Sequence, residues 1–98
     1  LRQRQAEAED FLQRIEADVR VAFLDVQASE QQLAVARERV ALAKQELSLA
    51  ETRFRAGVSS NLEVIQAQNA QAAATDTEIA AVYAVNLAKA SLVRAVGR

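Results

Sequence analysis

The residue types that perform most protein chemistry are scarce in this sequence. It contains no cysteine and no histidine, which removes the usual thiolate nucleophile and the commonest general base and metal ligand. Ser59 and Ser60 are adjacent hydroxyls without a histidine to activate them. Carboxylate pairs such as Asp76 and Glu78 are two residues apart, a spacing at which side chains do not face each other on a helix. We therefore expect no catalytic site, no metal site and no cofactor, and we predict that the protein is not an enzyme.

The feature that orders the sequence is Gly57, the only interior glycine of a chain without proline. Glycine suits the position that follows a helix, where the backbone turns left-handed and a Cβ would clash. Arg53 and Arg55 precede it, and cations favour the negative, C-terminal end of a helix. The sequence therefore predicts that a helix ends just before Gly57.

A second helix should begin immediately after this turn. Ser60 and Glu63 have the spacing of a capping box, in which the two side chains accept hydrogen bonds from backbone N–H groups at a helix start. The sequence thus predicts one helical hairpin over 1–98, with a helix over about 1–55, a turn over about 56–59 and a helix over about 60–96.

Apolar and small residues recur at three- and four-residue steps through the first predicted helix. A strict seven-residue repeat predicts a left-handed supercoil with a partner helix, and small residues let that partner approach closely. The larger members of this seam are Leu12, Val19, Val26, Leu33, Val40, Leu47 and Phe54. The interleaved and mostly small members are Ile15, Ala22, Ser29, Ala36, Ala43 and Ala50.

The first helix also carries a second apolar column, separated from the seam by a polar strip. The second apolar column consists of Val21, Ala28, Val35, Leu42 and Leu49. The polar strip consists of Asp25, Gln32, Arg39, Glu46 and Arg53. Two apolar flanks suit a helix with a neighbour on either side, as in a barrel or bundle. The alternative is that the second column only widens an ordinary core face.

Small residues also define a predicted seam on the second helix. Alanine recurs every seven residues, and the positions between these alanines are small as well. Small side chains at a seam allow tight packing, although alanine is also simply a good helix former. The alanine column is Ala67, Ala74, Ala81, Ala88 and Ala95, and the interleaved positions are Ala70, Thr77, Ala84 and Ser91.

Composition and charge complete the fold prediction. Nearly half of the apolar residues are alanine, so the core should be thin. The 12 basic and 13 acidic residues nearly balance, which gives no support to a nucleic-acid partner. The longest charge-free run, Val64–Thr75, is too short for a membrane-spanning helix, and no signal peptide is visible. We predict an all-α fold, a long antiparallel helical hairpin of the coiled-coil type, about 80 Å long at 1.5 Å per residue.

Three segments resemble the family of TolC-like outer-membrane efflux proteins. The turn and the start of the second helix are similar to the family's aromatic-x-x-Gly turn and the leucine-acid-valine sequence that follows. The end of the chain is similar to the family's closing alanine- and leucine-rich motif, and an early segment to the opening of its long helix. These segments are Arg53–Gln68, Leu87–Gly97 and Asp18–Gln27.

The resemblance implies that this chain is the second periplasmic hairpin of a longer channel protein. Family members are homotrimers whose hairpins build an α-helical barrel below an outer-membrane β-barrel, in the periplasm of Gram-negative bacteria. They export solutes passively, in efflux or type I secretion, by docking a periplasmic adaptor that is coupled to an inner-membrane pump. The resemblance assigns the adaptor contact to the tip residues Ala56, Gly57, Val58 and Ser59. It assigns the pore entrance to Glu63 and Gln66, although Gln66 stands where an acid can occur.

Two other interaction functions remain open from the sequence. A self-associating helical-hairpin interaction protein would have a similar size and turn position, but such proteins usually carry a Trp-x-Gly turn and this chain has no tryptophan. The coiled-coil hairpin of an adaptor would be flanked by lipoyl-like β segments. The isolated chain should self-associate to cover its second apolar column.

Overall fold

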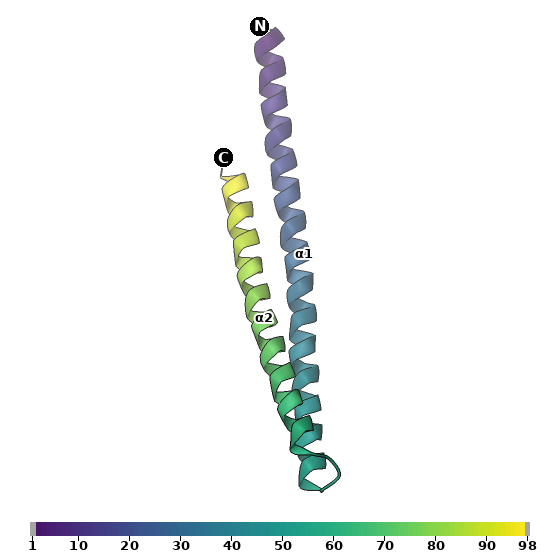
Figure 1. Cartoon of the computed structure of the whole chain (residues 1–98). Coiled ribbons are helices and arrows are strands. Elements are labelled where there is room, and N and C mark those ends of the chain that lie inside the picture. Colours follow the sequence, from purple (N-terminus) through teal and green to yellow (C-terminus); the bar gives the residue numbers. More distant parts are fainter. Residues whose placement is uncertain (1, 98) are drawn as a thin grey trace.

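The computed structural model describes residues 2–97, which form two long α-helices joined by a tight turn (Figure 1). α1 spans Arg2–Arg55 and α2 spans Asn61–Val96. The helices run antiparallel and pack against each other, and the rod measures 84 × 14 × 13 Å. The described residues contain no β-strand. The predicted all-α helical hairpin is confirmed, while residues 1 and 98 at the ends of the predicted domain lie outside the described range.

The two helices differ in length, so that part of α1 has no partner within the chain. α1 has 54 residues and α2 has 36, and the N-terminal end of α1 extends beyond the C-terminal end of α2 (Figure 1). Residues 2–14 are all exposed. Leu12, the first predicted seam residue, is therefore exposed rather than packed, because α2 does not reach its level.

The seam of α1 follows the predicted seven-residue repeat from Ile15 to Ala50. The buried members are Ala22, Val26, Ser29, Ala36, Val40, Ala43 and Ala50, and the half-buried members are Ile15, Val19, Leu33 and Leu47. Ser29 tolerates this position because its hydroxyl donates a 2.9 Å hydrogen bond to the Val26 carbonyl one turn earlier. At the other end, Phe54, the last predicted seam residue, is 46% exposed. The buried seam of α1 therefore ends at Ala50, before the turn.

The seam of α2 includes the predicted alanine column, but its second column is not the predicted one. All five members of the alanine column are half-buried. Of the interleaved positions predicted to join them, Ala84 is half-buried, whereas Ala70, Thr77 and Ser91 are exposed. The seam instead continues on the other side of the alanine column. Its members there are the buried Val64 and Val85 and the half-buried Gln71, Glu78 and Leu92.

The packing of α2 through the valine side of the alanine column, rather than through the small-residue side, has a steric explanation. Val64 and Val85 fill more volume against α1 than the small residues on the opposite side would, and a well-filled contact keeps more dispersion energy. The small side is left bordering an open groove. The core is thin, as predicted, since no side chain in residues 2–97 is less than 2% exposed.

One helix also meets a membrane criterion that the sequence analysis did not anticipate. α2 contains an 18-residue window with a mean hydropathy of 1.4, enough to cross a membrane by length and composition only. A charge-free run does not detect such a window, because isolated charges do not prevent a longer window from being apolar. Only 6% of that window is buried, so most of the apolar surface of α2 is uncovered within the hairpin.

Candidate functional site

The tip of the hairpin has the backbone geometry that the glycine predicts. Gly57 has a φ of +74°. The N–H of Val58 donates to the Arg53 carbonyl and that of Gly57 donates to the Phe54 carbonyl, both at 3.0 Å. This pair of bonds is the Schellman motif, which satisfies carbonyls at the end of a helix. A Cβ at Gly57 would meet no atom within 4 Å, so the tip offers open space around its backbone.

The structure brings the four predicted tip residues together but does not expose them equally. Ala56, Gly57 and Val58 are exposed, and the Val58 side chain, at 68%, is among the most exposed apolar residues. Ser59 is half-buried, and its Oγ is enclosed without a hydrogen-bond partner. Three of the four residues are thus accessible through their side chains or open backbone, whereas the Ser59 hydroxyl faces inward.

The predicted capping box at the start of α2 does not form. Ser60 occupies the N-cap position with extended backbone angles, but its side chain makes no capping hydrogen bond. Its carbonyl accepts a 3.2 Å bond from the Glu63 N–H. The Glu63 carboxylate is turned instead toward Arg53 of α1, with Oε2 4.0 Å from Nη2. A cationic partner across the turn therefore replaces the backbone N–H as the partner of this carboxylate.

Glu63 and Gln66, the predicted entrance residues, line one hollow just behind the tip. This entrance hollow has a volume of about 440 Å³ and is open to solvent. Its lining combines charged side chains from both helices with alanine and leucine side chains. Its lining residues are Glu46, Leu49, Ala50, Arg53, Glu63, Gln66, Ala67 and Ala70.

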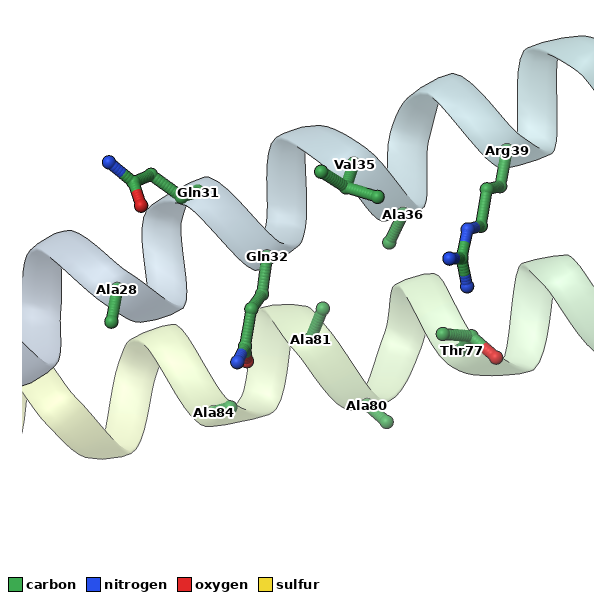
Figure 2. Close-up of a pocket in the computed structure, with 10 residues that line it drawn as sticks. All are labelled: Ala28, Gln31, Gln32, Val35, Ala36, Arg39, Thr77, Ala80, Ala81 and Ala84. Atoms are coloured by element: carbon green, nitrogen blue, oxygen red, sulfur yellow. The ribbon is translucent and has the colours of Figure 1, made fainter.

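A longer groove continues along the same side of the hairpin. Its central part has a volume of about 590 Å³ and is lined from α1 and α2 by mostly small residues. Figure 2 shows Gln32 and Arg39 of the polar strip extending from α1 toward α2, whereas Gln31 points away. Ala36 and Ala81 face each other on the floor. The groove therefore separates the seam from the second apolar column.

The second apolar column of α1 is not covered by α2. Val21, Val35, Leu42 and Leu49 are 58%, 48%, 55% and 59% exposed. The alternative that this column merely widens the core face is therefore wrong, because a core face would be buried against the partner helix. An exposed row of apolar side chains repeated every seven residues is typical of a helix face that packs against a neighbour.

Sequence reasoning missed the two ion pairs that join the helices. One is Arg53 with Glu63, and the other is Lys89 with Glu30, whose Nζ and Oε1 are 3.8 Å apart. Both ion pairs can be predicted once it is known which residues of α1 lie opposite which residues of α2. In three successive hollows Ala22 lies with Ala95, Ala36 with Ala81 and Ala50 with Ala67. Each fourteen-residue step on α1 is thus matched on α2.

A comparison with known families gives this rod a context. A family model described as outer membrane efflux protein matches residues 1–98. The chain belongs to the outer membrane efflux protein family. The resemblance seen in the sequence is therefore confirmed, and the hairpin is part of an efflux channel component of the Gram-negative outer membrane. No curated protein and no solved structure matches the chain significantly.

Membership of an outer membrane efflux family places this hairpin in a transport class rather than an enzymatic one. In such a protein the features of interest are surfaces that contact other proteins and surfaces that line the path of the solute. The residues predicted for these tasks lie at the exposed tip and in the entrance hollow behind it. Both are positioned by the same short turn.

Proposed function

We propose that this hairpin is a wall segment of a trimeric channel that exports solutes passively in efflux or type I secretion. In this proposal it is a fragment of a longer protein and lies in the periplasmic, α-helical part of the channel. The observation that carries the proposal is the second apolar column, which runs along α1 exposed and unpaired. A helix in a closed wall needs one apolar flank for each of its two neighbours, and α1 has two.

The angle between the two flanks also suits a wall. At 100° per residue, the second apolar column lies about 100° around α1 from the small column of the seam. The polar strip lies in the arc between them. When neighbouring helices pack on both flanks, that narrower arc faces the concave side of the wall. The polar strip would then line the water-filled interior of the channel.

The tip suits docking of a periplasmic adaptor, which would connect the channel to an inner-membrane pump. Ala56, Gly57 and Val58 are exposed at the apex of the rod, where a partner meets no other part of the hairpin. The missing Cβ at Gly57 lets a partner approach the backbone closely. Ser59 would contribute through its backbone, because its hydroxyl is enclosed.

The entrance hollow suits the mouth of the channel. Glu63 and Gln66 lie behind the tip, on the side of the hairpin that carries the polar strip, and both are exposed. In a trimer each subunit would present one such hollow around the pore. Polar and charged side chains at a constriction determine which ions pass it.

Cysteine cross-linking in cells tests the docking proposal. Residues 1–98 contain no cysteine, so Val58→Cys introduces a unique thiol in this region of the full-length parent. Val93→Cys is the matched control, because Val93 is similarly exposed, 71% against 68%, and lies near the other end of α2. We expect the thiol at position 58 to capture a periplasmic adaptor and the thiol at position 93 not to capture it.

Two results would count against the docking proposal. Equal capture of the adaptor at both positions would show that contact is not confined to the tip. Capture of only a second copy of the same protein from position 58 would favour a self-associating hairpin. The channel-wall proposal has a separate check, because Leu42→Cys on the second apolar column should cross-link to a neighbouring helix of the same channel.

A further inference from the structure

We propose that Arg53 sets the charge selectivity of the channel entrance by offsetting the carboxylate of Glu63. The inference rests on the proposed placement of Glu63 at the entrance. It adds a residue from the other helix, Arg53, that neither the family match nor the turn motif assigns to the entrance.

The position of the ion pair makes it part of the entrance. Arg53 lies in the last turn of α1 and Glu63 in the first turn of α2, so their contact bridges the helices directly behind the tip. Nη2 and Oε2 are 4.0 Å apart, and the two side chains are 48% and 46% exposed. A half-exposed pair contributes little to stability. Its main effect is therefore to place a positive charge beside a carboxylate that faces the entrance hollow.

The charges that line the hollow show how much depends on this one guanidinium. Its charged residues are Glu46, Arg53 and Glu63, and Gln66 is uncharged. The hollow thus carries a net charge of −1 with Arg53 and would carry −2 without it. Arg55 does not substitute for Arg53, because it lines a different hollow together with Phe54 and Asn61.

Electrostatic range makes the local balance more important than the charge of the whole chain. At physiological ionic strength exposed charges are screened beyond about 8 Å, so an ion at the entrance responds mainly to the groups around it. Rings of carboxylates favour cations, and rings of basic side chains favour anions. Three symmetry-related hollows would multiply the effect. Arg53 therefore keeps the entrance weakly charged, so that anionic and cationic solutes both pass.

Single-channel measurements on the full-length channel in planar lipid bilayers test this inference. The readout is the reversal potential in a potassium chloride gradient, which gives the ratio of cation to anion permeability. We expect Arg53→Gln to raise this ratio several-fold and Glu63→Gln to lower it. The double variant should return close to the wild-type ratio, because the net charge of the hollow is then restored. Arg53→Lys, which keeps the charge, should leave the ratio unchanged.

Arg55→Gln is the matched control, because it removes the same charge two residues away, from a side chain that lines a different hollow. It should change the ratio much less than Arg53→Gln. If Glu63→Gln shifts the ratio and Arg53→Gln does not, Arg53 does not offset the entrance charge and the inference fails while the entrance placement stands. If none of the Arg53 and Glu63 variants shifts the ratio, the placement of Glu63 at the entrance is itself wrong.

Discussion

The two apolar flanks of α1 have similar chemistry and opposite environments. The seam flank buries mostly alanine, such as Ala36 at 3% exposure, while Leu49 on the second apolar column remains 59% exposed. The seam thus buries only alanine, serine and valine and half-buries Leu33 and Leu47, while the leucines of the second apolar column stay exposed. A self-sufficient domain buries most of its large apolar side chains. Full burial of one leucine side chain stabilises by about 1.5–3 kcal/mol. The hairpin therefore takes its shape from the seam and leaves much of its apolar stabilisation to neighbours.

Enlarging a seam residue should have the largest effect on the hairpin. Ala36→Leu should push the helices apart, because overpacking a tight contact costs about 1–3 kcal/mol of unfolding free energy. Ala34→Leu is the matched control, since Ala34 is exposed two residues away on the same helix. Chemical unfolding, monitored by far-ultraviolet circular dichroism, measures the unfolding free energy of each variant. Equal losses for the two variants would show that the seam is not tightly packed.

The second apolar column should show the opposite behaviour. The isolated hairpin is expected to self-associate through this exposed flank. Leu42→Gln combined with Leu49→Gln should abolish association in sedimentation velocity experiments. The unfolding free energy of the dilute monomer should change by less than about 0.5 kcal/mol, because neither side chain is buried by α2. A wild-type hairpin that is already a monodisperse monomer would contradict the prediction that the hairpin self-associates through the second apolar column.

The smallest expected effect concerns the ion pair far from the tip. Lys89→Gln removes the contact with Glu30. The Lys89 and Glu30 side chains are 58% and 53% exposed, so the loss should cost at most about 0.5 kcal/mol of unfolding free energy. The loss should shrink further at high salt, since exposed charges are screened. Adding Glu30→Gln to this variant should cost nothing more. A larger, salt-independent loss would mean that charges rather than the seam hold the helices together.

The sequence contained enough information for the turn and for α1. Gly57 is the only interior glycine, and glycine takes a left-handed conformation without strain. A seven-residue repeat can be followed without knowing the partner helix. The seam of α2 was only half predictable, because small residues flank the alanine column on one side and valines on the other. The choice between these sides depends on the shape of α1, which no local pattern contains.

The predicted site residues divide in the same way. The sequence placed Glu63 and Gln66 beside the tip, because their position depends only on that of the turn, and their role stays a prediction. From the sequence we predict that Glu63 caps the start of α2. In the structure no side chain makes a capping hydrogen bond there. The contact with Arg53 was missed because a cross-helix pair depends on the register, and the register depends on the length and geometry of the turn. Leu12 was misplaced for a related reason, since the repeat does not show where the partner helix stops.

The tight turn at Gly57 also determines the order in which the helices come together. The residues just before and after it are close along the chain, so their contacts close the shortest loops and cost the least chain entropy. Contacts farther from the turn close longer loops and are favourable only after the nearer ones exist. We therefore expect pairing to start at the tip and to proceed outward, and local contacts of this kind form rapidly. In the reverse direction, the end where α1 outruns α2 is the first to separate.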